Sequence, residues 1–382
     1  MLRTVFARLL LTAATLFMCG GLLHGATNER ADSIMESVFT YTARQGLRLH
    51  GFQSKSYLRF RISTARRNFI CKYIPGLFPL EKGEHDYFGE ALLHSQYTSP
   101  GSLNQKVIAL YSTLPPLQHL TPRVTDNVSI SLYNPTLLVE RILSPVHIRN
   151  RRFYKYQYSY DYTTTTGDTL HHIDIIPRFH NTQLVQGYIE ISSRTGGVRR
   201  FDFSAYYDLH HLHMAGTLGE SGLASLLPRE LHFTTNMKLL GNKIRSRFDV
   251  TTDYLNILTP PDTTIAGSTV KGYDLTEANH LKTDTTLMRR DRAFFDTIRP
   301  YPLSDDELFL YTDTLRPDFR PAPQQTTHNI MTRRTEDLLF DSHQINVLHN
   351  GSIKLPPILT PSMFQWSPQK GISLQTRLVG NL

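Results

Sequence analysis

Five tyrosines at alternate positions constrain the fold of this chain more than any other feature. Within residues 153–163 every second residue is a tyrosine, and polar side chains stand between them. This period of two is typical of a β-strand with one buried and one wet face. The tyrosines are Tyr154, Tyr156, Tyr158, Tyr160 and Tyr162. We predict that all five project from one face of a strand and that this strand pairs with residues 170–177.

The flanking segments predict further antiparallel strands. After a polar turn at 163–168, strands are expected at 170–177, 185–192 and 198–207, with a glycine-closed hairpin at 194–197. A later hairpin is expected to pair 231–240 with 243–254 across Gly241 and Asn242. Upstream, the pattern predicts strands at 51–62, 87–97 and 105–112. Between residues 124 and 143 the pattern is mixed: 128–133 favours a strand and 137–142 a helical turn.

Together these elements predict a mainly β fold. Asp32 or Ser33 can cap a short N-terminal helix that ends near Gln45 and Gly46. The expected architecture is a curved, open antiparallel sheet with this helix before it and a largely irregular C-terminal tether after it. The expected boundaries are 1–26 for a signal peptide, 27–257 for the sheet domain, 258–350 for a Pro-rich tether with short helices, and 351–382 for the C-terminal segment.

The N-terminal residues have the features of a secretion signal. Arg3 and Arg8 precede an apolar stretch at 9–23, and Gly25 and Ala26 offer small side chains for cleavage. A membrane anchor is the alternative, but threonines and glycines interrupt the stretch, which is shorter than the roughly 20 residues that span a bilayer. A cleaved Sec signal would export the chain to the periplasm.

Cysteine content and charge restrict the chemistry of the exported chain. Removal of the signal leaves Cys71 as the only thiol, so an internal disulfide cannot form. The formal net charge falls from +8 to +6, because Arg3 and Arg8 leave with the signal. The basic residues are spread along the chain without a basic helix or an aromatic RNA-binding motif, which argues against nucleic acid as a partner. Contact with anionic lipid or lipopolysaccharide at a membrane surface agrees with both the charge and the export.

From about residue 258 the composition changes to prolines, threonines and aspartates with little periodicity. This change predicts a mobile tether over 258–350 that builds no core. Two short helices are expected in it, one near 289–297 and one opened by the capping box from Ser304 to Glu307. Residues 372–379 alternate again and predict one more amphipathic strand with nothing after it.

Several short motifs occur in a characteristic order along the chain. They are Ser144-Pro145, Phe153-Tyr154-Lys155-Tyr156, Ile175-Ile176-Pro177-Arg178, Gly187-Tyr188-Ile189-Glu190-Ile191 and Phe295-Asp296-Thr297-Ile298-Arg299-Pro300-Tyr301-Pro302-Leu303. In this order they resemble an uncharacterised family of bacterial outer-membrane proteins, and the resemblance covers most of residues 31–382. None of these motifs is catalytic.

The resemblance implies a domain arrangement and a fold. Such proteins usually have a carboxypeptidase-regulatory-like β-sandwich, then a periplasmic domain, then a C-terminal outer-membrane β-barrel. The periplasmic part is similar to lipoprotein-carrier half-barrels, in which the concave face holds an acyl chain. In this chain strands are expected only after residue 50, and 351–382 would be the remnant of a first barrel strand. We therefore expect a shortened relative or the product of a truncated gene.

Groups that could carry chemistry are weak in this sequence. Asp208, His210, His211 and His213 form the most metal-like group, since His211 and His213 would share a strand face; a polar turn is the alternative. His171 and His172 alternate between faces and cannot act together. Residues 219–222 resemble a nucleophile turn but lack its Gly-x-Ser-x-Gly spacing, which favours a loop. Cys71 is interpreted as a small buried hydrophobe. We assign no catalytic, metal-binding or cofactor-binding residue.

The remaining candidates are apolar and aromatic members of the alternating strands. We predict a ligand-binding wall formed by Tyr154, Tyr156, Tyr158, Phe201, Phe203, Phe248 and Val250. Ordinary sheet packing is the alternative for the tyrosines. The leading interpretation is a non-enzymatic cell-envelope protein; the alternatives are a lipid, lipoprotein or hydrophobic-ligand binding module and, third, a hydrolase. The expected partners are outer-membrane or envelope components, with lipid or lipoprotein as candidates, and no nucleic acid.

The signal peptide gives the first testable prediction. Met18 stands before Cys19, where a lipidated cysteine needs a small preceding residue, so we expect cleavage near Thr27 without lipid. Intact-mass measurement of the exported protein checks this. A diacylated Cys19 at the N-terminus would contradict it and make the protein a lipoprotein.

Overall fold

The computed structural model describes part of the chain. The described residues are 29–46, 48–66, 85–98, 102–113, 131–137, 142–179, 181–207, 210–239, 242–259, 282–284, 292–313, 343–347, 351–355, 364–367, 371–374 and 379–381. The predicted signal peptide, Cys71 and Asp208 lie outside them. Among the described helices, none combines the length and hydropathy needed to cross a bilayer.

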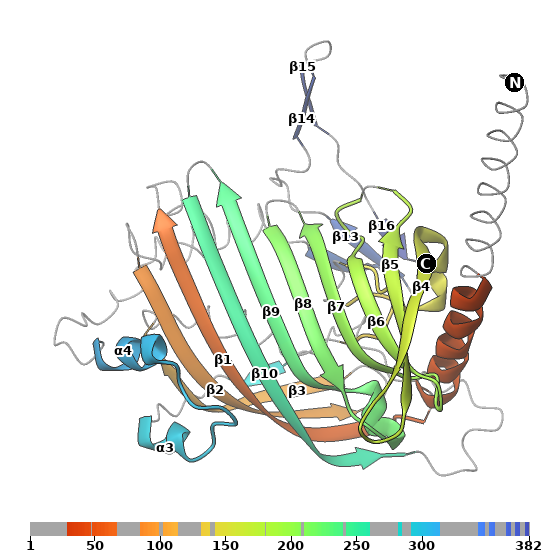
Figure 1. Ribbon diagram of the computed structural model, residues 1–382. Coiled ribbons are helices and arrows are strands. Elements are labelled where there is room, and N and C mark those ends of the chain that lie inside the picture. Colours follow the sequence, from red (N-terminus) through yellow and green to blue (C-terminus); the bar gives the residue numbers. More distant parts are fainter. Residues whose placement is uncertain are drawn as a thin grey trace, which may run out of the picture.

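One wide antiparallel sheet dominates the described residues (Figure 1). Its strands are β1 (Gly51–Arg66), β2 (His85–Thr98), β3 (Ser102–Ser112), β4 (Tyr154–Thr163), β5 (Thr169–Pro177), β6 (Gln186–Ser192), β7 (Val198–Tyr207), β8 (His210–Leu218), β9 (Pro228–Leu239) and β10 (Asn242–Leu258). The spatial order is β3-β2-β1-β10-β9-β8-β7-β6-β5-β4, and β11 (Lys282–Asp284) adds a parallel strand beside β3. The sheet is therefore open, with β4 at one edge and β11 at the other.

The sheet joins two meanders through the pairing of β1 with β10. The two strands run antiparallel from Gly51 opposite Leu258 to Arg66 opposite Lys243. One meander comprises β1 to β3 and the other β4 to β10, so the first strand of the sheet lies beside a strand that begins far along the chain. Neither hairpin pattern nor alternation in the sequence predicts this contact.

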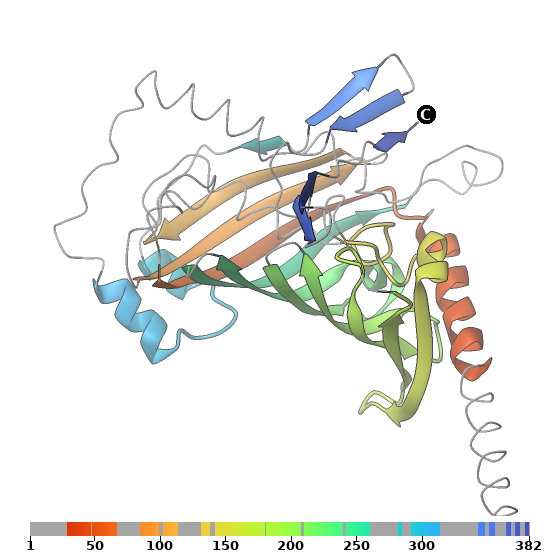
Figure 2. The ribbon, with the colours of Figure 1, turned by 90° about the horizontal axis from the view of Figure 1, so that it is seen from above.

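The two faces of the sheet differ in what covers them. We call the face that carries Phe60, Phe201 and Phe248 the core face, and the opposite face the outer face. The N-terminal helix at 29–46 and the segment at 131–153 belong to the same hydrophobic cluster as the core face. The helix buries Ala31, Met35, Val38 and Phe39, which recur at helical spacing. Figures 1 and 2 show this helix beside β4, at the opposite end of the sheet from α3 (Arg292–Asp296) and α4 (Asp305–Asp313).

The smaller described elements lie outside the main sheet. Two 3₁₀ turns, η3 (Ile148–Phe153) and η4 (Gly222–Leu226), stand in connections. Near the C-terminus, β12 (His343–Val347), β13 (Gly351–Leu355) and β16 (Val379–Asn381) form one small sheet, and β14 (Phe364–Ser367) pairs with β15 (Gly371–Leu374) in another. Of the strand predicted at 372–379, residues 375–378 lie outside the described residues, so its continuity stays a prediction; its ends fall in β15 and β16.

A bulge divides the tyrosine strand. Tyr158 lies opposite Ile173, but Tyr160 lies opposite His172, so Ser159 is an extra residue on β4. An extra residue reverses the alternation of the side chains that follow it. The predicted pairing of this strand with 170–177 is confirmed, whereas the single face for all five tyrosines is wrong.

The first three tyrosines belong to the core face, and the last two to the outer face. Tyr154 and Tyr156 are buried in the core cluster, and Tyr158 packs against it. After the bulge, Tyr160 stacks on the ring of His172, and the hydroxyl of Tyr162 donates to Glu190. This reversal cannot be predicted from the sequence, because tyrosines and polar residues keep alternating through Ser159.

Other expected elements are confirmed or corrected in the same way. The strands and hairpins predicted in both meanders are present, with ends that differ by a few residues. β8 was predicted only as an alternative to a polar turn, and it is a strand paired with both β7 and β9. The described part of the strand expected at 128–133 is a turn. Of the helical turn expected at 137–142, residues 138–141 lie outside the described residues. At its two ends Leu137 N donates to Ile142 O (2.8 Å), next to an isolated bridge between Thr136 and Leu143.

The two helices predicted in the tether exist, and the segment around them packs on the sheet. The capping box at α4 is confirmed: Ser304 N donates to Glu307 Oε2 (3.0 Å) and Glu307 N to Ser304 Oγ (3.4 Å). Phe295 of α3 is fully buried against Tyr57 and Ala109 on the outer face. Residues 292–313 thus depart from the expectation of a tether without a core, whereas most of 258–350 lies outside the described residues.

A buried carboxylate fixes this segment to the sheet. Glu90 of β2 has no exposed side-chain surface. Arg299 donates to both oxygens of the Glu90 carboxylate, from Nε to Oε1 (2.6 Å) and from Nη2 to Oε2 (2.7 Å). The hydroxyls of Tyr57 and Tyr311 donate to the same carboxylate. Tyr311 also stacks on Tyr111 of β3, with ring centroids 4.0 Å apart. Four donors therefore compensate a charge that is otherwise costly to bury.

This arrangement predicts a large effect of Arg299→Gln. The substitution leaves the Glu90 carboxylate buried with no charged partner, and we expect a loss of about 3 kcal/mol in the free energy of unfolding. Chemical denaturation measures it. The double variant Glu90→Gln/Arg299→Gln should regain part of the loss, because it removes the unpaired charge.

Tyr301→Phe is the matched control. It removes the bonds of the half-exposed Tyr301 hydroxyl to Glu230 (3.0 Å) and Thr251 and should cost less than about 1 kcal/mol. Equal stability of Arg299→Gln and wild type would show that residues 292–313 are a loose tether in solution.

Candidate functional site

The candidate site is the core face together with what covers it. We call the helix at 29–46 and the described residues of 131–153 the cover. Beneath it, the hydroxyl of Tyr154 donates to Leu143 O (2.6 Å) and that of Tyr156 to Pro145 O (2.7 Å). Burial raises the pKa of both phenols, so both remain donors at any physiological pH. The tyrosines of β4 thus hold an irregular segment over the sheet through its backbone carbonyls.

Two more hydroxyl contacts attach the cover to other parts of the sheet. Val198 N of β7 donates to the hydroxyl of the buried Tyr133 (2.8 Å). The hydroxyls of Tyr41, on the helix, and Ser225, in η4, share a hydrogen bond. Phe39 of the helix meets Tyr156 edge to face, with ring centroids 6.4 Å apart. The cover therefore touches both the tyrosine strand and the connections of the neighbouring strands.

Ion pairs at the rim connect the helix to η3 and β4. Arg151 Nη1 lies 2.9 Å from Glu36 Oε2, and Arg151 Nη2 lies 3.8 Å from Asp32 Oδ1. Arg30 Nη2 lies 2.5 Å from Asp161 Oδ2. The guanidinium of Arg30 also lies over the ring of Tyr158, 4.1 Å from its centroid. All these groups are partly or largely exposed, so each pair contributes at most about 1 kcal/mol.

The seven residues predicted for a ligand wall all lie on the core face. Tyr154, Tyr156, Phe201, Phe203, Phe248 and Val250 are buried in its hydrophobic cluster, and Tyr158 packs against that cluster. The ring centroids of Phe201 and Phe203 lie 5.2 Å apart. The ring centroid of Phe248 lies 6.4 Å from that of Phe60 and 6.0 Å from that of Phe233. The residues thus share a face as expected. Their role in ligand binding stays a proposal, since side chains or cover would have to move to admit a ligand.

Two glycines allow large rings to lie flat on this face. A Cβ at Gly89 would come within 2.3 Å of the Phe60 ring, and one at Gly216 within 2.8 Å of the Phe201 ring. A side chain at either position would displace an aromatic ring from the core. The missing side chains therefore set the depth to which the phenylalanines lie in the sheet.

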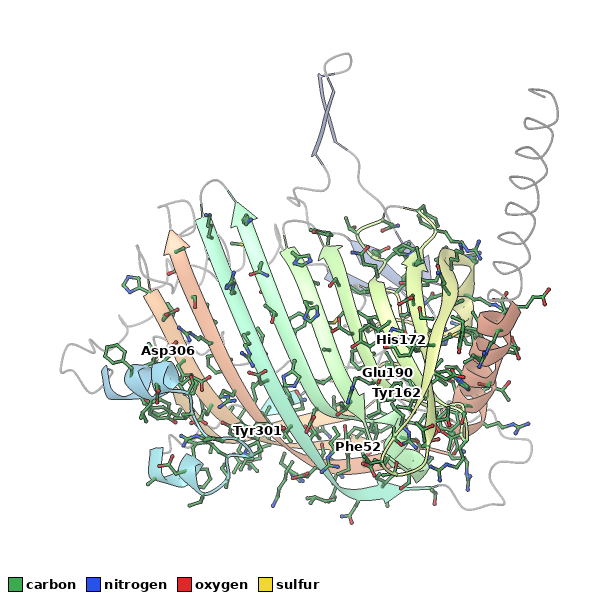
Figure 3. All side chains as sticks on the ribbon, viewed as in Figure 1. Phe52, Tyr162, His172, Glu190, Tyr301 and Asp306 are labelled. Carbon is green, nitrogen blue, oxygen red and sulfur yellow. The ribbon has the colours of Figure 1, made fainter. Side chains whose placement is uncertain are left out.

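The outer face carries an aromatic and acidic cluster that the sequence analysis missed. His172 of β5 lies between Tyr160 and Tyr188, with ring centroids 4.6 and 4.4 Å away. Figure 3 shows His172 close to Glu190 and Tyr162 on neighbouring strands. Burial, followed by the bond to Glu190, raises the pKa of Tyr162 to about 12. Only the bulge at Ser159 brings the last two tyrosines to this face, so alternation alone could not reveal the cluster.

The histidines proposed as a metal group are held by other contacts. His213 Nε2 lies 2.9 Å from Asp202 Oδ1, and His211 packs on Tyr206 with centroids 4.6 Å apart. Asp208 lies outside the described residues. Within the described part of the chain, no group of three or more histidines, cysteines or carboxylates is arranged to hold a metal ion. His171 and His172 do lie on different faces, since His171 bonds Asp161 at 2.6 Å.

The turn at 219–222 is a loop, as expected. Gly219 N donates to Leu227 O (3.2 Å), and Gly222, with φ of +59°, opens η4. This positive φ explains a glycine at that position.

Residues 34–255 match the model of a family of unknown function, DUF5686. The chain belongs to this family. The match covers most of the N-terminal helix and β1 through most of β10, and it ends before α3. No curated protein matches the chain.

Solved structures show weak similarity. A LolA superfamily protein from Nitrosomonas europaea is 12% identical, with 61% of this chain and 96% of that chain covered and a TM-score of 0.21. A putative outer membrane lipoprotein-sorting protein domain from Vibrio parahaemolyticus is 10% identical, with coverage of 62% and 97% and a TM-score of 0.22. MucB is 8% identical, with coverage of 59% and 94% and a TM-score of 0.20. Similarity at this level does not transfer a ligand to this chain.

One pair on the outer face predicts a pH dependence. His232 Nδ1 lies 2.6 Å from Asp249 Oδ1, and this bond raises the pKa of His232 above 6.5 despite partial burial. Burial acts to raise the pKa of Asp249, but His232 and Arg247 together hold it below 3.8. The stabilisation by His232 is therefore full below pH 6.5 and lost as pH rises through the raised pKa. The stabilisation by the Asp249 carboxylate is fully present above pH 3.8 and is lost as the pH falls through its lowered pKa.

We expect His232→Gln to flatten the fall in melting temperature between about pH 6 and pH 8. The effect should stay below about 1 kcal/mol, because the histidine is half exposed. Melting curves across this range measure it, with His211→Gln as the control on the same face. An unchanged pH profile of His232→Gln would mean that the pair does not form in solution.

Proposed function

We propose that this chain is a non-enzymatic binding module of the bacterial cell envelope that holds an acyl chain between the core face and the cover. One observation carries the proposal: a largely apolar face extends across ten strands, and a helix and an irregular segment pack on it and are attached to β4, β7 and η4 through hydroxyls and an ion pair. A cover of this kind can separate from the sheet without breaking a β-ladder.

The energetics of the cover favour such opening. The carbonyls of Leu143 and Pro145 accept from tyrosine hydroxyls, and water can replace a hydroxyl as donor when the cover lifts. The ion pairs of Arg30 and Arg151 are exposed and weak. The main cost of opening is therefore the exposure of apolar surface, and an acyl chain in the gap would offset that cost.

The chemistry of the face fits an acyl chain better than a polar ligand. Most of its buried side chains are aliphatic or aromatic, with a few polar ones such as Ser56 and Thr252, which hydrogen-bond each other. The two glycines let rings lie close to the backbone. Burial of a chain of about ten methylenes would contribute roughly 8 kcal/mol before ordering costs, which is enough for micromolar binding.

An envelope location follows from the predicted signal peptide and from the motifs that resemble outer-membrane proteins. The proposed place of the domain is the periplasm, next to the outer membrane. Lipid or a lipoprotein would then be the source of the acyl chain. The family has no established function, so this location supports the proposal without naming the ligand.

Arg151→Gln tests the cover. The variant removes the two ion pairs from η3 to the helix and the contact of the guanidinium with the ring of Phe39, 5.6 Å from its centroid. A fluorescent fatty acid should therefore associate roughly three-fold faster while the melting temperature changes little. Stopped-flow fluorescence on the exported chain measures the rate. Arg152→Gln is the matched control, because its guanidinium lies over Phe153 instead of reaching the helix.

Phe203→Asp tests the face itself. It should abolish binding of the fatty acid, because it places a carboxylate on the apolar wall. If the wild-type chain binds no such probe, or if Phe203→Asp only unfolds the sheet, the core face is a filled core and the chain acts as a scaffold.

A further inference from the structure

Five cations gather at one end of the outer face. They are Arg61 on β1, Lys238 on β9, and Lys243, Arg245 and Arg247 on β10, and we call them the basic patch. Their strands are adjacent in the sheet, and the end that carries them is the upper edge of the sheet in Figure 1. Lys238, Lys243, Arg245 and Arg247 are exposed.

The register of the strands places like charges directly opposite each other. Lys238 faces Lys243 across β9 and β10, and Arg61 faces Arg247 across β1 and β10. Like charges at directly opposed positions destabilise a sheet. Lys238, Lys243 and Arg245 are exposed, so the fold does not require a cation at these positions. The arrangement costs stability, and an external anionic partner would offset that cost.

Nearby acids neutralise only part of the patch. Arg61 Nη2 lies 2.9 Å from Asp86 Oδ2, and Arg247 Nε lies 2.9 Å from Asp249 Oδ2. Arg245 Nε donates to the neutral amide oxygen of Asn236 (3.0 Å). Arg61 Nη1 also lies 3.8 Å from Asp306 Oδ2 of α4. These ion pairs involve the cations nearest the middle of the sheet, so the charge at its very end stays positive.

An exposed aromatic ring lies at the same end. Tyr206 of β7 is 65% exposed and lies opposite His211 of β8. His211 lies opposite Asn236 of β9, and Asn236 lies opposite Arg245 of β10. Tyr206 and Arg245 therefore belong to one row of paired residues across the sheet. Tyrosine rings with exposed faces are enriched where a protein meets the headgroup level of a bilayer. The row therefore combines cations with a residue suited to a lipid interface.

We propose that the basic patch docks this domain, end on, to a bilayer surface that contains anionic lipid. The patch spans three strands and about five residues along them, which is roughly 10 Å by 15 Å. A basic patch of this small size fits a flat anionic surface. A long polyanion would instead need basic residues along an extended part of the protein surface. Each Lys or Arg near such a surface strengthens binding about five-fold. This docking does not depend on the proposed acyl binding, because the patch lies on the opposite face from the predicted wall.

Lys238→Gln/Lys243→Gln/Arg245→Gln tests the docking. We expect the wild-type exported chain to sediment with phosphatidylcholine vesicles that contain about 30% phosphatidylglycerol and to be released by about 0.5 M salt. The triple variant should bind these vesicles roughly a hundred-fold more weakly. Its melting temperature should equal or exceed that of the wild type, because the Lys238–Lys243 opposition is gone.

Arg44→Gln/Arg48→Gln/Lys55→Gln is the matched control. It removes the same net charge from exposed positions outside the patch and should retain wild-type vesicle binding. The proposal is overturned if both triple variants lose binding equally, since net charge would then suffice. It is also overturned if the wild type ignores these vesicles, including the case in which it binds duplex DNA or an acidic protein instead.

Discussion

The antiparallel pairing of β1 with β10 is the contact on which the rest of the structure depends. It unites the meander of β1 to β3 with that of β4 to β10 and aligns their apolar side chains on one continuous core face. Without it each meander would have an unpaired edge and a smaller apolar face to bury. Closing a loop this long has an entropic cost that the buried ladder must exceed, so both meanders have to be largely formed before the pair is stable.

The two faces created by this pairing differ in the side chains that they carry and in the segments that cover them. The core face is largely apolar and is covered by a helix and an irregular segment that polar contacts attach to β4, β7 and η4. The outer face carries aromatic rings, histidine–aspartate pairs and cations. The segment at 292–313 packs on the outer face over β1 to β3, where the Glu90–Arg299 pair fixes it, and reaches β9 through the bond from Tyr301 to Glu230. Acyl binding on one face and membrane docking at the end of the other are thus compatible in a single sheet.

Local patterns predicted most of the strands but few of their partners. Alternation and turn residues suffice for hairpins such as β6–β7 and β9–β10, because the strands are adjacent in sequence and one glycine turn sets their register. The bulge at Ser159 left no trace in the alternation of β4, and it moved Tyr160 and Tyr162 to the outer face. The Arg299–Glu90 contact joins residues that only the assembled sheet brings together, so the composition of 258–350 suggested a tether throughout.

The sequence by itself determined that this chain forms a mainly β domain with one apolar face and an N-terminal helix, because period and turn chemistry are local properties. It also placed the seven aromatic and aliphatic residues of the predicted wall on one face. Tertiary structure alone decided which segments cover that face, where Glu90 finds its four donors, and which cations oppose each other in the basic patch. Those outcomes depend on pairings between distant segments, whose register is set by packing and loop closure and is not written in any short stretch of residues.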